Sequence, residues 1–205
     1  MGVPSILMMS IGSVMTFGMN KILLMFSSTA AAVFGVYFKL QSFFFMPIFG
    51  MNNGIVPIIA FNYGAHHKKR ITSTIKIGCI AAFCVMMLGM IAFNVIPDVL
   101  LGFFNASDEM LEIGCKALRI ISYSYILAAF CIVLGSVFQA LGNGVYSLIV
   151  SICRQLIVLL PCAFILAKTL GLNAVWWSFP LAELASITVT LILYRRIYMQ
   201  KINTL

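Results

Sequence analysis

Long apolar stretches alternate with short polar segments along this chain. The stretches lie at about residues 4–26, 30–65, 73–97, 114–140, 144–168 and 174–194. A membrane-spanning helix needs roughly 20 mainly apolar residues, so the pattern predicts six such helices. The second stretch is too long for one straight helix, and we therefore expect a kinked or broken helix there.

Composition indicates the same class of protein. Hydrophobic residues make up 62% of the chain, charged residues make up 9%, and the mean hydropathy is +1.09. Soluble domains contain about 25% charged residues. We therefore predict an all-α polytopic membrane protein, in which residues 1–205 form a single unit of six transmembrane helices in the lipid bilayer.

The formal net charge is +8, but the basic residues do not follow one face as a nucleic-acid-binding surface would require. They gather after the second and sixth stretches, at Lys68, Lys69, Arg70, Lys76, Arg195, Arg196 and Lys201. Most of the acids lie between the third and fourth stretches, at Asp98, Asp108, Glu109 and Glu112. Short loops rich in Lys and Arg stay in the cytoplasm. We expect a multi-pass protein of the plasma membrane (the inner membrane of a bacterium), with both termini cytoplasmic and the acidic loop outside.

The second stretch carries residues that a simple membrane anchor would not need. Within it lie Lys39, Gln41, Pro47, Gly50, Asn52, Asn53, Gly54 and Pro57. Charged and amide side chains are costly in hydrocarbon, so they usually face a bundle interior or a wet cavity. Pro and Gly interrupt the helix where neighbours or water can satisfy the freed backbone groups. The combination is typical of a substrate or ion pathway.

The residues of this stretch allow more than one role. We expect Lys39 to face a cavity and Gln41 to be a candidate substrate contact. Asn52 and Asn53 either line the cavity or bond to backbone groups that the helix breakers free. Pro47, Gly50, Gly54 and Pro57 are the candidate helix-breaking positions, and the Gly pair also has the spacing that permits close helix packing.

Besides Lys39, three charged residues that lie away from the ends of the predicted spans, or could reach the interface from one, require an explanation. Lys21 is close enough to a span end for its ammonium group to reach the interface. Arg154 reaches the interface in the same way, binds a carbonyl at a helix end, or lines the cavity with Lys39. Glu183 is the one acid within a span and is the candidate cation-coupling residue, although a structural hydrogen bond or an ion pair to Lys39 or Arg154 is the alternative.

Neither cysteine chemistry nor catalysis is indicated. The six cysteines contain no C-x-x-C pair and all lie inside predicted spans, so we interpret them as packing residues rather than as disulfide or metal-binding groups. The chain has no H-E-x-x-H or G-x-S-x-G motif and no nearby pair of intramembrane acids. We therefore expect no catalytic residues and no metal site.

The run from Phe44 to Ala65, FFMPIFGMNNGIVPIIAFNYGA, followed by a basic loop, resembles the eighth helix of the multidrug and toxic compound extrusion (MATE) transporters. Other segments match the family's seventh, tenth and eleventh helices in the same order: Gly2-x-Pro4-Ser5, Phe104–Glu109, Phe138–Asn143, Arg154-Gln155 and Pro161. The resemblance covers nearly the whole chain, and all of it falls in the C-terminal six-helix lobe of a twelve-helix fold.

This resemblance implies half of a secondary active efflux transporter. Such proteins export organic cations and other amphipathic drugs in exchange for protons or sodium ions, without a further cofactor. The family's cation sites use membrane-embedded carboxylates, and the matching region of the first span, Gly12-Ser13, has no acid. We therefore expect a first six-helix lobe, or a second copy of this chain, as a partner. The alternative is a lipid-linked precursor flippase or a channel-like protein of related architecture.

Overall fold

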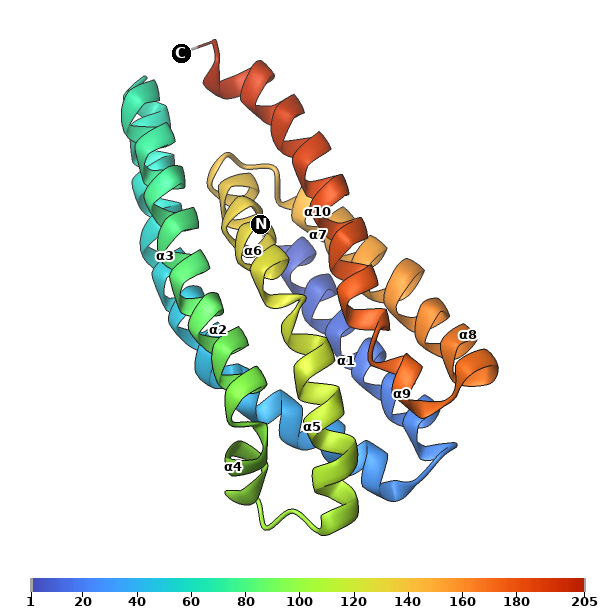
Figure 1. The fold of residues 1–205 in the computed structure, drawn as a ribbon. Helices are drawn as coiled ribbons and strands as arrows, with labels where there is room; N and C mark the ends of the chain where they lie inside the picture. Colours follow the sequence, from blue (N-terminus) through green and yellow to red (C-terminus); the bar gives the residue numbers. More distant parts are fainter. Residues whose placement is uncertain (1, 205) are drawn as a thin grey trace.

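The computed structural model describes residues 2–204, with side chains from residue 6 onward, and is helical almost throughout (Figure 1). The elements are α1 Gly2–Leu24, α2 Ser28–Gly64, α3 Lys68–Val95, α4 Pro97–Gly102, α5 Asp108–Ser122, α6 Tyr125–Ala140, α7 Gly144–Ile152, the π-helix η1 Cys153–Leu159, α8 Leu160–Leu170, α9 Leu172–Val175, α10 Ser178–Ile197 and the π-helix η2 Tyr198–Ile202.

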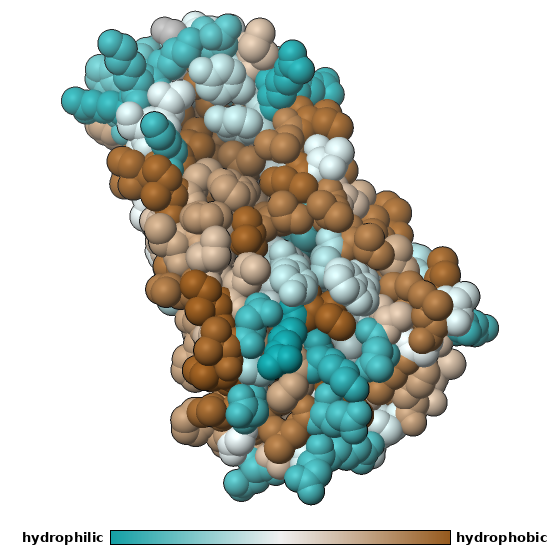
Figure 2. Space-filling model, viewed as in Figure 1, coloured by the Kyte–Doolittle hydropathy of each residue, from teal (hydrophilic) through white to brown (hydrophobic). Residues whose placement is uncertain are grey.

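The helices are long and apolar enough to cross a membrane. Five helical segments in the described residues meet this test, and the bent pair α5–α6 provides a sixth. Figure 2 shows apolar residues across the middle of one face and polar residues at its upper end, with a second polar area over α5. The predicted all-α membrane fold is confirmed.

The second span is kinked but not broken. α2 remains helical through Pro47, Gly50, Gly54 and Pro57, over 37 residues. A straight helix of that length would measure roughly 55 Å, whereas the hydrocarbon core is about 30 Å thick. α2 instead changes direction, crossing the lower end of the molecule before it runs alongside α3 (Figure 1). The expected kink is therefore found, whereas the four candidate helix-breaking residues do not break the helix, because proline and glycine bend a helix whose neighbours hold it in place.

The interrupted span is the fourth one, which we expected to be continuous. α5 and α6 meet at a 51° bend that contains no proline or glycine. Two serine hydroxyls stabilise it: Ser122 Oγ donates to the carbonyl of Arg119 (2.7 Å), and Ser124 Oγ donates to that of Ile121 (2.6 Å). The carbonyl of Ile121 also accepts from the backbone N–H of Ser124 at 2.9 Å, so the hydroxyl bonds add to the backbone bonds that hold the bend.

Close contact between α2 and α3 depends on glycines of α3, not on those of α2. A Cβ atom added to Gly89 would lie 2.8 Å from the ring of Phe44, whereas one added to Gly50 or Gly54 would meet nothing within 4 Å. Beside Gly89, Phe93 packs edge-to-face on Phe44, with ring centroids 5.7 Å apart. The predicted packing role of the Gly50–Gly54 pair is therefore not found among the described residues.

Candidate functional site

A cavity of about 1080 Å³ lies among α1, α2, α6, α7, η1 and α10. Its rim on the α1–α2 side is made of side chains that are themselves exposed, including Met9 (78% exposed), Phe17 (64%) and Met46 (68%). The cavity is therefore open on that side, and it is large enough for a drug-sized molecule.

The cavity wall combines aromatic rings, methionines and uncharged polar groups. The rings are those of Phe17, Tyr37, Phe38, Phe45, Phe49, Phe138 and Phe179. The polar groups include Ser13, Thr16, Asn20, Gln41, Asn52, Asn53, Gln139, Ser147 and Gln155. Among the residues that the structure describes, the charged members of the wall are Arg154 and Glu183. Such a wall suits an amphipathic molecule with few fixed hydrogen-bonding groups.

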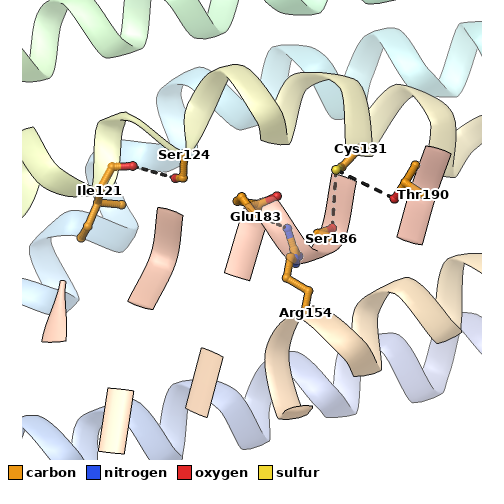
Figure 3. Close-up of polar contacts among 7 residues, drawn as sticks. All are labelled: Ile121, Ser124, Cys131, Arg154, Glu183, Ser186 and Thr190. Atoms are coloured by element: carbon orange, nitrogen blue, oxygen red, sulfur yellow. Dashed lines mark hydrogen bonds and ion pairs between the residues drawn. The ribbon is translucent and has the colours of Figure 1, made fainter. Parts of the chain in front are cut away.

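Arg154 and Glu183 form an ion pair at the cavity wall. Arg154 Nη1 donates to Glu183 Oε1 at 2.9 Å, from η1 to α10 (Figure 3). The Glu183 side chain is 10% exposed and that of Arg154 is 30% exposed, so the guanidinium has better access to the open space. Glu183 Oε2 is buried and has no hydrogen-bond partner within the described part of the chain. The pair therefore leaves one carboxylate oxygen free to take a proton or a cation.

The π-helix η1 sets the position of Arg154. The proline at position 161 has no backbone N–H, so it cannot continue the α-helical hydrogen-bond ladder. Just before it, the N–H of Leu160 donates to the carbonyl of Gln155, five residues back. Such wider turns rotate the side chains that precede them and are frequent at functional sites. Here Arg154 and Gln155 lie in the wide turn and both line the cavity.

A polar row on α10 extends from the carboxylate. Glu183, Ser186 and Thr190 follow one another at intervals of three and four residues, so they share one face of the helix. The hydroxyls of Ser186 and Thr190 donate to the sulfur of Cys131 on α6, at 3.5 and 3.9 Å (Figure 3). We did not predict Ser186 or Thr190 as site residues, although their helical spacing from Glu183 is visible in the sequence.

Three of the amide residues predicted on α2 line the cavity, namely Gln41, Asn52 and Asn53. Asn52 is also buried and joins α2 to α6. Its Nδ2 donates to the carbonyl of Ile132, and its Oδ1 accepts from Ser136 Oγ, both at 3.4 Å. Asn52 therefore has a structural partner, whereas Asn53 is exposed at the rim.

The structure corrects the expectation for Lys39. This residue is exposed, is not part of the cavity wall, and holds its Nζ 5.7 Å from the centre of the Phe104 ring. Lys39 follows the buried Tyr37 by two positions, and residues two apart on a helix point in different directions. Its ammonium group therefore contacts the segment after α4 instead of the cavity or Glu183.

The helix-bending residues of α2 share an exposed face. Pro47, Gly50, Gly54 and Pro57 are all exposed, as are the neighbouring Phe43 and Phe61. A proline leaves the carbonyl four residues before it without its helical N–H donor. Pro47 does so to the carbonyl of Phe43, and Pro57 to that of Asn53. Free backbone groups at membrane depth require a protein or water partner.

Comparison with known proteins identifies the family. The model of the MatE family matches residues 4–165, which is most of the chain. The chain belongs to the MATE family of membrane transporters. Its hydropathy and its helical fold agree with this assignment, and the resemblance seen in the sequence is confirmed.

Curated relatives of this MATE chain are multidrug export proteins named MepA. The chain is 29% identical to MepA of Staphylococcus aureus over 194 residues, which covers 94% of this chain and 43% of that protein. It is 27% identical to MepA of Staphylococcus haemolyticus over 182 residues, or 89% of this chain and 40% of that protein. The chain therefore spans less than half the length of the curated relatives that it matches.

Solved MATE structures have the same fold. The outward-facing conformation of a multidrug resistance MATE family transporter superposes with a TM-score of 0.90 at 22% identity, covering all of this chain and 46% of that one. The inward-facing conformation of such a transporter gives a TM-score of 0.85 at 23% identity, with 95% and 46% covered. The described helices thus correspond to one lobe of the transporter fold.

Proposed function

We propose that this chain is half of a secondary active efflux transporter, which exports organic cations or other amphipathic drugs in exchange for protons or sodium ions. The observation that carries the proposal is the cavity of about 1080 Å³, with aromatic and amide walls and one buried carboxylate. Its rings can stack on a flat or cationic molecule. The multidrug export function of the MepA relatives supports the same substrate class.

Glu183 is the residue we propose for coupling. Its Oε1 is paired with Arg154, whereas its buried Oε2 has no partner in the described residues. A proton or sodium ion at Oε2 would reduce the charge that holds a cationic substrate near this wall. Substrate and coupling ion would therefore compete for one carboxylate, which is the requirement for exchange. Gln41, Asn52 and Asn53 are proposed as substrate-lining residues, and Arg154 as the group that orients the carboxylate.

A partner is needed to complete the proposed transporter. The curated relatives are more than twice as long as the matched segment. The cavity is open on the α1–α2 side, and the exposed face of α2 carries Asn53 and backbone carbonyls freed by Pro47 and Pro57. Lipid cannot satisfy such groups. A first six-helix lobe, or a second copy of this chain, would cover this face and close the cavity.

The proposed setting is the inner membrane of a bacterium, with both termini in the cytoplasm. The basic segments Lys68–Arg70 and Arg195–Lys201 then face the cytoplasm, and the acidic segment Asp98–Glu112 lies outside. A flippase for a lipid-linked precursor would need several basic residues in the cavity to bind phosphate, and Lys39 and Arg154 were the candidates for this role in the sequence. Lys39 lies outside the cavity and Arg154 is paired with Glu183, so this alternative is not favoured.

Efflux from membrane vesicles tests the proposal. The chain should show no ion-driven export of a fluorescent organic cation by itself, and a first lobe of the same family should restore export under a proton or sodium gradient. Glu183→Gln should then abolish coupling while the protein still accumulates, because the amide cannot ionise. Glu112→Gln is the matched control, since Glu112 is exposed and pairs only with Lys116 on the surface of α5.

Two results would refute the proposal in different ways. Robust coupled export by the chain alone would refute the need for a first lobe and would indicate a transporter made of two copies of this chain. Wild-type coupling in a well-expressed Glu183→Gln variant would exclude this carboxylate as the coupling site.

A further inference from the structure

A second, smaller hollow lies between the last turns of α2 and the first turns of α3, at the end of these helices that carries the basic segment Lys68–Arg70. Its volume is about 330 Å³. One end of its lining is polar and includes Lys69, Arg70 and Asn62, and the other end is formed by Ile58 and Ile77. The hollow does not share any lining residue with the central cavity. It therefore requires an explanation of its own.

The polar end has the chemistry of a phosphate site. Lys69 and Arg70 are exposed and lie in the first turn of α3, a helix of 28 residues whose start has no side-chain cap. The N-terminal turn of a helix attracts anions through its free N–H groups. The neighbouring Lys68 does not contribute, because its Nζ is bound to Asn203 Oδ1 at 2.7 Å. The side chain of Ser73, one turn further along, adds a hydroxyl group to the lining.

Asn62 supplies a second and independent feature. Its side chain is only 7% exposed and lines the hollow. Its Nδ2 donates to the carbonyl of Ile58 at 2.8 Å, whereas its Oδ1 has no partner within residues 2–204. A buried acceptor needs a donor. The ligand that fits must therefore carry anionic oxygens for the basic residues and a hydroxyl or amine donor for this amide.

The hollow continues into an apolar strip on the surface of α3. Exposed apolar residues follow it along one face of the helix, at intervals of three, four or eight residues: Ile77 (67%), Ile80 (54%), Leu88 (64%), Ile91 (50%) and Val95 (70%). This strip runs from the basic end of the helix across the apolar band of the molecule. An acyl chain attached to a headgroup in the hollow would lie along it.

We propose that this groove between α2 and α3 is a binding site for an anionic phospholipid whose headgroup bears hydroxyl groups. Lys69 and Arg70 bind the phosphate, Asn62 Oδ1 accepts from a headgroup hydroxyl, and the acyl chains lie on Ile77 and the residues that follow it. Basic pockets between transmembrane helices commonly bind acidic headgroups. The site goes beyond the proposed transport function and does not depend on it.

Native mass spectrometry of the purified chain with added lipid tests this site. Phosphatidylglycerol should bind at least tenfold more tightly than phosphatidylcholine. Lys69→Gln/Arg70→Gln should weaken phosphatidylglycerol binding about 25-fold, at roughly fivefold for each basic side chain near the headgroups. The matched control is Arg195→Gln/Arg196→Gln, which removes the same charge from two exposed residues at the end of α10 and should change binding less than threefold. Circular dichroism should be the same for both variants.

Asn62→Ala distinguishes the hydroxyl contact from the charge. It should remove the preference for phosphatidylglycerol over phosphatidic acid, which lacks the second glycerol, and leave phosphatidic acid binding unchanged. Glycerol phosphate and inorganic phosphate should not displace the lipid at millimolar concentration. Displacement by either would mean that a free anion, not a lipid, occupies the site.

Three further results would also overturn the proposal. One is equal weakening by the two pairs of substitutions, which would indicate a diffuse surface charge. Another is equal binding of phosphatidylglycerol and phosphatidylcholine. The last is loss of phosphatidylglycerol binding when a first lobe is added, because protein and not lipid would then cover the groove.

Discussion

The ion pair between Arg154 and Glu183 leads to the prediction that a second substitution restores stability lost through the first. Arg154→Met should destabilise the protein strongly, and adding Glu183→Gln to that variant should stabilise it again. The reason is the asymmetry of burial, because the Glu183 side chain is 10% exposed and that of Arg154 is 30% exposed. Without Arg154 the carboxylate would have no partner at either oxygen in a buried position.

The expected magnitudes follow from this geometry. Removing one partner of a buried pair costs about 3–5 kcal/mol, because a charge remains unpaired. Glu183→Gln alone should cost less, about 1.5–3 kcal/mol for the loss of a charged hydrogen bond, because the guanidinium of Arg154 still reaches the open cavity. In the double variant neither charge remains, so its free energy of unfolding should exceed that of Arg154→Met.

Thermal unfolding of the purified chain provides the assay, and it is monitored by tryptophan fluorescence, to which the buried Trp176 and its neighbour Trp177 both contribute. The exposed pair Glu112–Lys116 is the matched control, since its side chains are 73% and 50% exposed. Removing either of these residues should change stability by less than about 1 kcal/mol. A double variant less stable than Arg154→Met would refute the reasoning, because it would show that burial of an unpaired charge is not what makes the single variant unstable.

Other substitutions test the packing, the topology and the corrected position of Lys39. Gly89→Ala should lower stability by about 1–3 kcal/mol in thermal unfolding, because its Cβ would lie 2.8 Å from an aromatic ring, whereas Gly50→Ala should have no such effect. In a background without native cysteines, Ser107→Cys should react with an impermeant thiol reagent from outside and Lys69→Cys should not, and the reverse would overturn the proposed orientation. Lys39→Ala should leave the range of exported substrates unchanged in the efflux assay. Selective loss of some substrates would instead show that Lys39 contacts substrate in the cavity.

The class of the protein and the approximate positions of its helices could be predicted from the sequence. Hydropathy summed over about 20 residues is a local quantity, and a membrane imposes it on each span separately. The resemblance of the Phe44–Ala65 segment to one MATE helix was equally local, and the family comparison confirms it. Some helix ends also have a local signal, since serine is a favoured residue at a helix start and Ser107 caps α5 by accepting from the N–H of Met110.

The bends of the helices were predicted less well. Proline and glycine pointed to a break in α2, yet α2 continues as a kinked helix and the sharper bend lies between α5 and α6. No residue of the type that usually ends a helix marks that bend. It is held by Ser122 and Ser124, whose hydroxyls bond to nearby carbonyls. The presence of serine in an apolar stretch does not indicate whether its hydroxyl will bond to a nearby carbonyl and hold a bend.

The sequence by itself determined that Glu183 is an acid within a span and that Lys39 and Arg154 were its possible partners. Only the tertiary structure decided between them, because the choice depends on how each helix is rotated about its axis. The π-helix η1 turns Arg154 toward α10, 29 positions away in the sequence, whereas Lys39 points away from the cavity. A hydropathy pattern indicates which segments of the chain cross the membrane. The partner of each side chain is set by packing between helices that are distant in sequence.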